Sequence, residues 1–159
     1  MKESWQPHGS LGGIVILLGQ NLTIFGKKEL VKNGMKHISW GRFWVLQALN
    51  EAPQNQASLC KKLDQKAPSM IDMLRRLNDE KIIKFIAHPN DVRRKEWSLT
   101  TKGKKDYQKA KKILRNIGFK MDTFLKENKV EPSEIQRVNE ILSLLNNQLV
   151  SDMSEYQEV

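Results

Sequence analysis

Residues 68–99, PSMIDMLRRLNDEKIIKFIAHPNDVRRKEWSL, join a helical pattern directly to a two-stranded pattern. Pro68 suits the first turn of a helix that runs to about residue 80. An apolar run over residues 82–86 and an alternating run over residues 95–99 flank turn-forming residues 88–91, which predicts a β-hairpin. The helix is expected to turn its regularly spaced apolar residues inward: Met70, Ile71, Leu74 and Leu77.

A shorter helix is predicted just before this stretch. Residues 54–63 form a short polar pattern, and residues 64–67 form a turn. Two short helices separated by about four residues are typical of a helix-turn-helix. Because a hairpin follows at once, the stretch predicts a winged helix-turn-helix. Its second helix would enter the major groove of DNA, and its hairpin would form the wing.

Long helices are predicted on both sides of this module. Upstream lie a helix over residues 11–33 and a helix that starts at a Ser39 cap and ends before Pro53, with a short strand fragment at residues 35–38. Downstream, Thr100 or Thr101 caps a long helix, and a last helix starts near residue 131. The terminal helices carry heptad-like apolar stripes, which indicate partner helices. We expect them to pack between two chains, with packing inside one chain as the alternative.

The expected fold class is therefore mainly α with a small β-hairpin wing. We divide the chain into an N-terminal dimerisation helix (residues 1–34), a winged helix-turn-helix module (35–100) and C-terminal dimerisation helices (101–159).

The charge is concentrated in the middle of the chain, which has a net charge of +9 overall. Residues 61–105 hold 13 basic and 6 acidic side chains, whereas residues 128–159 hold 2 and 6. A basic block favours a polyanionic partner, with nucleic acid first and an anionic membrane surface second. A solvated lysine-rich surface is the alternative. The basic side chains placed to contact phosphates, or a minor groove at the hairpin tip, are Lys61, Lys62, Lys66, Arg93, Arg94 and Lys95.

Other classes find little support in the sequence. The three histidines are scattered, and neither a metal-binding cluster nor a phosphate-binding glycine loop is present. We therefore expect no enzyme activity, metal or cofactor. With one cysteine, Cys60, no intrachain disulfide can form, and we interpret it as a small hydrophobic residue rather than a redox switch. No apolar run reaches the roughly 20 residues of a membrane span, and we expect a cytoplasmic protein.

Residues 91–103, DVRRKEWSLTTKG, resemble the wing of the MarR family, which runs Asp-x-Arg, three residues, Leu-x-Leu-Thr, one residue and Lys-Gly. Residues 69–77 resemble the family's recognition helix, residues 38–49 its second helix, and residues 132–134 the start of its last helix. The resemblance implies a homodimeric, sequence-specific regulator of transcription that binds double-stranded DNA. We expect a repressor that a small ligand releases. The alternative is a winged-helix protein-interaction module that has lost DNA reading.

The resemblance also assigns roles to single residues. Arg93 would enter the minor groove, and Asp91 would orient the wing by pairing with an arginine. A small aromatic or anionic effector would bind between the dimerisation helices and the module. Its candidate contacts, for which a core role is the alternative, are Phe25, His37, Trp40 and Trp44. The side chains implied to face the major groove are Ser69, Asp72, Met73 and Arg76.

Three positions depart from the family pattern. Asp72 places a carboxylate near phosphates, which is unfavourable unless it pairs with a base amino group or with a neighbouring arginine. For Arg75 and Arg76, surface ion pairing with acidic neighbours is therefore the alternative to DNA contact. Lys81 replaces the glycine that usually closes the recognition helix, and Trp97 replaces a wing leucine.

Overall fold

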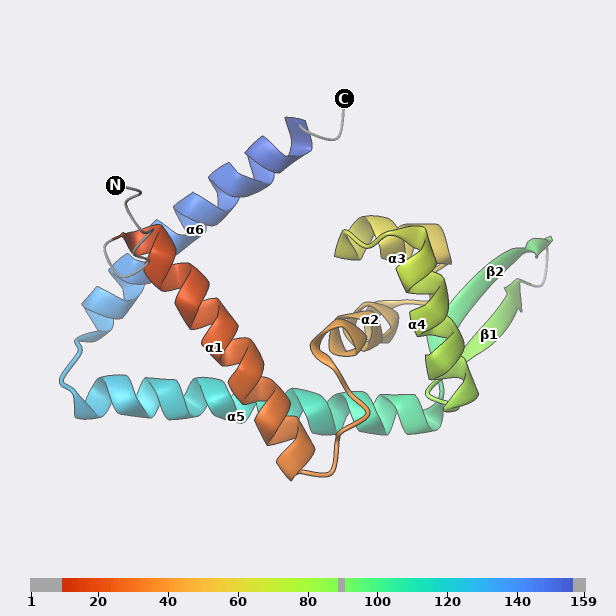
Figure 1. The fold of residues 1–159 in the computed structure, drawn as a ribbon, viewed down its shortest axis with the longest axis horizontal. Helices are drawn as coiled ribbons and strands as arrows, with labels where there is room; N and C mark the ends of the chain where they lie inside the picture. The colour runs from red at the N-terminus through yellow and green to blue at the C-terminus, as the bar shows by residue number, and fades with distance from the viewer. Residues whose placement is uncertain (1–9, 89–90, 156–159) are drawn as a thin grey trace, which may run out of the picture. The chain divides into compact units, whose positions relative to one another are not determined.

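The computed structural model describes residues 10–88 and 91–155, with side chains for residues 10–86 and 96–153. Six helices and one two-stranded antiparallel sheet follow the chain order of Figure 1, which confirms the mainly helical fold with a hairpin. None of the helices in the described ranges combines the length and apolar character needed to cross a membrane. The elements are α1 (Leu11–Lys32), α2 (Trp40–Glu51), α3 (Gln56–Leu63), α4 (Ala67–Asp79), β1 (Ile83–His88), β2 (Asp91–Leu99), α5 (Thr101–Glu127) and α6 (Pro132–Glu155).

The chain forms two compact units. The first, Met1–Ile117, holds α1 to β2 and the first half of α5. The second, Gly118–Val159, holds the rest of α5 and α6.

Side-chain caps start four of the helices. The Ser39 hydroxyl accepts from the backbone N–H of Arg42 at 3.3 Å, which confirms the predicted cap of α2. The Asn55 side chain accepts from the Ser58 N–H at 2.8 Å, and this bond starts α3 two residues later than the sequence pattern suggested. Each cap satisfies one of the amide donors that a helix start leaves without an intrahelical acceptor. The other two caps are Ser10 and Thr100.

A left-handed residue follows the end of four helices. After α1 this residue is glycine, Gly34, with φ of +76°. The other three are not glycine, although a left-handed conformation is costly for a residue with a Cβ. All four residues close a turn in which later N–H groups bond back to helix carbonyls. In α1, α4 and α5 this turn is the Schellman arrangement. The three are Asp64 (φ 47°), Lys81 (φ 59°) and Lys129 (φ 60°).

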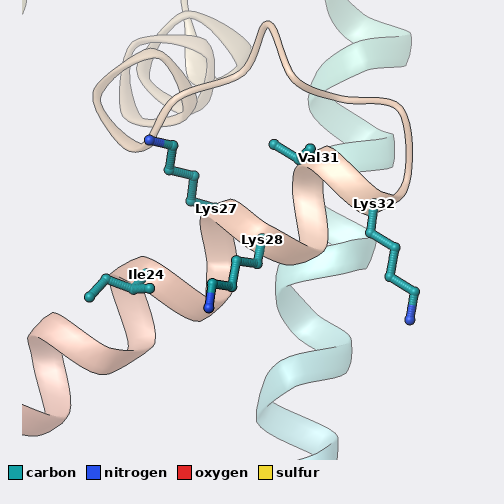
Figure 2. A pocket seen from close by; sticks show the side chains of 5 residues that line it. All are labelled: Ile24, Lys27, Lys28, Val31 and Lys32. Carbon is teal, nitrogen blue, oxygen red and sulfur yellow. The ribbon is translucent and has the colours of Figure 1, made fainter.

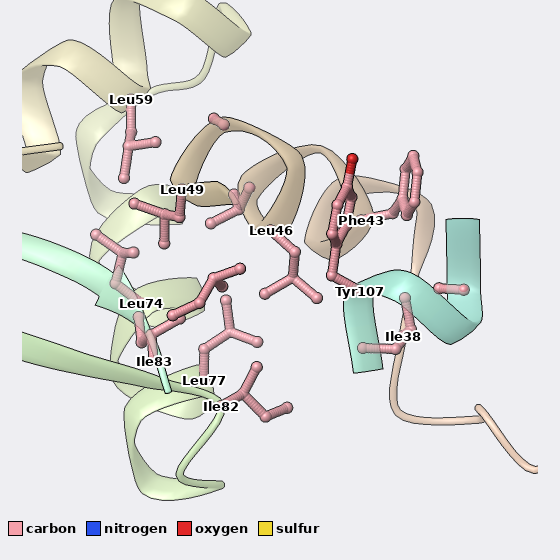
Figure 3. Packing of buried hydrophobic residues seen from close by; sticks show 14 of the residues in the cluster. Ile38, Phe43, Leu46, Leu49, Leu59, Leu74, Leu77, Ile82, Ile83 and Tyr107 are labelled. Atoms are coloured by element: carbon pink, nitrogen blue, oxygen red, sulfur yellow. The ribbon is translucent and has the colours of Figure 1, made fainter. Parts of the chain in front are cut away.

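One hydrophobic core joins α2, α3, α4, the hairpin and the first half of α5 (Figure 3). The Phe43 ring stacks on the Tyr107 ring with centroids 5.8 Å apart, so α2 and α5 pack directly on each other. Burial of this apolar surface stabilises the module and fixes the outward direction of each helix. Residues at or near zero exposure include Leu46, Leu59, Met70, Leu74, Leu77, Ile82 and Ala110.

The hairpin pairs Ile83 with Leu99 and Phe85 with Trp97, and its register shifts between Ala87 and His88. The Phe85 and Trp97 rings pack edge to face with their centroids 4.5 Å apart. A third piece of backbone joins this sheet from before α3. The Trp97 N–H donates to the Gln54 carbonyl at 2.8 Å, and the Gln54 N–H donates back at 3.1 Å. The sequence pattern did not predict this contact.

Two local predictions are wrong. Residues 35–38 form a turn and not a strand, because the Met35 N–H bonds back to Leu30 and the Ile38 N–H to Met35. Ile71 does not face inward, since its side chain is 51% exposed. It follows the buried Met70 by one residue, which is about 100° around the helix, and it lies outside the buried face formed by Met70, Leu74 and Leu77.

Candidate nucleic-acid interface

The outer face of α4 is polar and backed by the rigid core. Its inner face holds Met70, Leu74 and Leu77, all at most 1% exposed. The opposite side of the helix therefore points to solvent, and this side is what α4 can offer to a groove. Of the residues that the sequence placed here, Ser69 is exposed and Arg76 has a side chain that is 63% exposed.

Asp72 lies in the middle of this face and binds two arginines. Its carboxylate contacts Arg75 Nη2 and Arg76 Nε, each at 2.8 Å. The hydrogen bond from Arg75, and then the one from Arg76, holds the pKa of Asp72 below its usual value. Both arginines therefore form ion pairs with Asp72, and DNA contact by Arg76 stays a prediction. The contact to Arg76 is made through Nε.

Met73 turns toward α2 rather than to the centre of the outer face. Its side chain packs partly against the core, and a Cβ added at Gly41 would lie 3.4 Å from Met73 Cε. This placement argues against a role for Met73 in reading bases. A small cavity of about 170 Å³ adjoins it, lined by Gly41, Trp44, Val45, Leu63, Gln65 and Met73.

The predicted phosphate contacts differ in their surroundings. Lys61, at the end of α3, and Lys66, just before α4, are exposed. Lys62 instead forms an ion pair with Glu51 of α2, which occupies its ammonium group in this state.

The backbone of residues 91–95 belongs to β2, as a wing requires. The side chains of Asp91, Arg93, Arg94 and Lys95 lie outside the described residues. Their assignments to the minor groove and to phosphates remain predictions.

A clamp between α2 and α4 was not foreseen from the sequence. Arg42 Nη1 and Nη2 donate to the two carboxylate oxygens of Glu80 at 2.9 and 2.8 Å. Nη1 also donates to the His37 carbonyl at 2.7 Å. The hydrogen bond from Arg42 holds the pKa of Glu80 below its usual value. Glu80 caps α4, so the clamp fixes the end of the proposed reading helix against the start of α2.

The segment Thr100–Gly103 holds the start of α5 against the residues that follow α4. The Thr100 hydroxyl lies 2.7 Å from the Lys81 carbonyl and 3.0 Å from the Ile82 carbonyl, and it accepts from the Gly103 N–H at 3.0 Å. A Cβ at Gly103 would lie 2.0 Å from the Ile82 carbonyl oxygen, a distance that no side chain can occupy. The Leu-Thr-x-Lys-Gly part of the wing motif therefore has a packing role.

Of the four candidate ligand residues, two lie in direct contact with each other and one contacts α5. The Trp40 and Trp44 rings meet edge to face at 5.8 Å, and each side chain is more than a third exposed. His37 Nε2 instead lies 3.1 Å from Asp106 Oδ2 on α5, and Phe25 is 39% exposed on α1.

A separate open depression of about 480 Å³ lies along α1, where three lysines flank two apolar residues (Figure 2). Its lining residues are Ile24, Lys27, Lys28, Val31 and Lys32. Among the described residues, no group of three or more His, Cys, Asp or Glu side chains is placed to hold a metal ion. Cys60 is partly buried against the core.

No protein-family model and no curated protein sequence matches the chain. Solved structures do match its fold. MepR, a transcription regulator of the Staphylococcus aureus multidrug efflux pump MepA, is 17% identical with a TM-score of 0.68, covering 88% of this chain and 98% of MepR. The reduced form of MarR from E. coli is 21% identical with a TM-score of 0.67, covering 86% and 96%.

The transcriptional repressor CouR, bound to a 23-mer DNA duplex, is 20% identical with a TM-score of 0.66, covering 92% of this chain and 99% of CouR. At these identities the likeness establishes the fold. The chain has the winged helix-turn-helix fold of MarR-family transcription regulators.

Proposed function

We propose that the protein is a sequence-specific regulator of transcription that binds double-stranded DNA. The observation that carries this proposal is the outer face of α4, a polar and arginine-bearing helix face held on a buried core beside a hairpin. Helices presented in this way fit the major groove and read base edges. The same fold is seen in CouR bound to a DNA duplex.

The contacts divide into reading and positioning groups. Ser69, Asp72 and Arg76 would face the bases, and Arg76 would offer its two Nη groups to guanine O6 and N7. Lys61 and Lys66 would neutralise phosphates beside the groove. The wing would add Arg93 in the minor groove, oriented by Asp91, with Lys62, Arg94 and Lys95 as further phosphate contacts.

We propose that the working form is a homodimer. α1 and α6 each carry large apolar side chains that remain exposed in the single chain, and contiguous apolar surface of this kind marks association sites. A dimer would set two α4 helices about one DNA turn, roughly 34 Å, apart. The exposed side chains include Leu11, Ile14, Leu18, Ile24, Val138, Leu145 and Leu149.

We further propose a repressor that a small aromatic or anionic effector releases. The half-exposed pair Trp40 and Trp44 offers aromatic surface, and Trp44 lines the cavity behind α4. An effector there would shift α4 relative to α2, and a small shift is enough to spoil the spacing of two reading helices. Phe25 and His37 remain candidates for its outer edge.

Selection of bound sequences from a random duplex pool tests the DNA-binding proposal. We expect one enriched palindromic site and affinity that falls steeply with salt, by about 0.9 in log–log slope per phosphate contact. Arg76→Ala should lose base preference at one position of each half-site. The free energy of binding should weaken by about 1–3 kcal/mol.

Arg93→Ala should weaken binding and lower the salt slope by about 1. The matched control is Lys36→Ala, an exposed cation in the turn before α2 that should leave both quantities unchanged. A protein that enriches no sequence and shows no salt-dependent DNA binding would instead be a winged-helix protein-interaction module.

A further inference from the structure

The first half of α5 carries far more basic than acidic side chains. Residues 101–115 contain 7 of the chain's 27 basic residues and a single acidic one, Asp106. That carboxylate already contacts His37 at 3.1 Å. The proposed contacts of α4 and the wing use none of these cations.

The lysines share the outer face of the helix. Gly103, Tyr107, Ala110 and Ile117 are buried and set the inner face. With 3.6 residues per turn, the remaining circumference points to solvent. The exposed side chains on it are Lys104, Lys105, Lys109, Lys111 and Lys112.

This face is not built for a membrane surface. The large apolar residues of the same segment, among them Ile113 and Leu114, are packed on the core. An interfacial helix needs an apolar stripe that can enter the lipid, and none is left on this part of α5. The surface offers charge alone, which suits a phosphate backbone.

The charge spacing also matches a duplex. Residues 104 to 115 span about 17 Å of helix at 1.5 Å per residue. A DNA duplex presents roughly ten phosphates over that length. Lysines three or four residues apart, such as Lys105, Lys109 and Lys112, repel each other and destabilise a free helix. A bound polyanion removes this repulsion.

The surface lies on a different helix from the proposed reading face. Leu74 of α4 and Tyr107 of α5 both point into one core, so the outer faces of the two helices leave that core in different directions. We therefore expect a straight duplex seated on α4 to leave the lysines of α5 uncovered.

The geometry points to a second nucleic-acid surface, the outer face of α5 from Lys104 to Lys112, that binds the phosphate backbone of another duplex segment. One molecule could then bridge two segments of DNA. This function goes beyond operator binding, because it needs no base recognition.

The test compares two variants of equal charge. The α5 variant changes Lys104, Lys105, Lys109 and Lys112 to Gln, and the control changes Lys32, Lys36, Lys126 and Lys129 to Gln. All eight side chains are exposed. Gln and Lys have similar helix propensity, so the fold should persist, and circular dichroism checks that it does.

The full chain is bound to an immobilised duplex of the selected sequence and then offered a labelled duplex of unrelated sequence. We expect the wild type and the control to capture the second duplex. The α5 variant should lose about tenfold or more in capture at moderate salt, with a log–log salt slope lower by about 3–4. Its affinity for the immobilised duplex should stay within about twofold.

Three results would overturn the proposal: equal capture by the α5 variant, an equal loss in the control, or no capture by the wild type. Vesicles of phosphatidylcholine with phosphatidylserine form a separate arm. Binding to these vesicles that the α5 variant loses, while its duplex capture persists, would assign the surface to lipid instead. Failure to enrich any sequence would overturn the operator proposal alone, since capture of unrelated duplex can be measured without it.

Discussion

At the scale of single residues, Gly103 has the least room for a side chain among the glycines compared. Any Cβ there would meet the Ile82 carbonyl oxygen at 2.0 Å, and backbone cannot yield as a flexible side chain can. We expect Gly103→Ala to reduce the free energy of unfolding by about 3 kcal/mol or more. Gly118→Ala is the matched control, because nothing lies within 4 Å of its Cβ position, and it should gain about 0.5–1 kcal/mol. Urea unfolding of both variants measures the difference, and similar stabilities would contradict the packing role of the motif.

Lys81 is a second residue whose backbone conformation favours glycine. Its φ of +59° closes the end of α4, where the Lys81 N–H bonds to Asn78 and the Ile82 N–H bonds to Leu77. Lys81→Gly should raise the free energy of unfolding by about 0.5–1 kcal/mol, since relief of left-handed strain exceeds the added entropy of the unfolded chain. Lys81→Ala removes the charge and keeps the strain, so its stability should match the wild type. An equal gain from alanine would show that charge, and not conformation, sets the effect.

At the scale of elements, the clamp between Arg42 and Glu80 couples the start of α2 to the end of α4. Arg42 is only 15% exposed, so removing its partner leaves a largely buried charge. Glu80→Gln should lower the free energy of unfolding by about 1–2 kcal/mol near neutral pH. The loss is smaller than for a fully buried ion pair because the Glu80 side chain is 36% exposed.

The pKa of Glu80 is lowered in the folded state, chiefly by the hydrogen bond from Arg42. Its stabilisation is therefore complete above the unfolded pKa near 4.5 and is lost as pH falls through the folded value. Urea midpoints of wild type and Glu80→Gln should approach each other as the pH falls below 4.5 and through the lowered folded pKa. A gap that stays constant from pH 7 to the acid limit would rule out this linkage.

The elements themselves were largely predictable, and their mutual contacts were not. Helical spacing and local caps such as Ser39 depend on neighbours in sequence, so the order of helices and the hairpin followed from the pattern. The pairing of Arg42 with Glu80 spans 38 residues and leaves no periodic signal. The bridge between Gln54 and Trp97 joins residues that are even farther apart in sequence.

Of the candidate site, the pattern predicted the exposed face of α4 but not the packing of Met73 against the core. Whether a side chain at the edge of a helix face is buried depends on the neighbouring helix, which here brings Gly41 of α2 close to Met73. The sequence could not reveal that neighbour.

At the scale of the whole molecule, the exposed apolar stripe of α6 predicts a dimer. A charge placed in this stripe should dissociate that dimer. Leu149 is 61% exposed in the single chain, so Leu149→Glu removes little intrachain packing. If a partner buries it, the loss of about 1.5 kcal/mol from each of two copies weakens dimerisation by about 100-fold. Asn147→Glu places the same charge on the opposite side of α6 and serves as control.

Sedimentation equilibrium should show dimers for wild type and Asn147→Glu, and mostly monomers for Leu149→Glu at micromolar concentration. The monomer should also bind a palindromic duplex more weakly than the dimer, because one α4 helix engages one half-site. Circular dichroism should remain helical in all three, which separates dissociation from unfolding. A wild type that sediments as a monomer, or a Leu149→Glu variant that stays dimeric, would mean that the stripe on α6 is covered in another way.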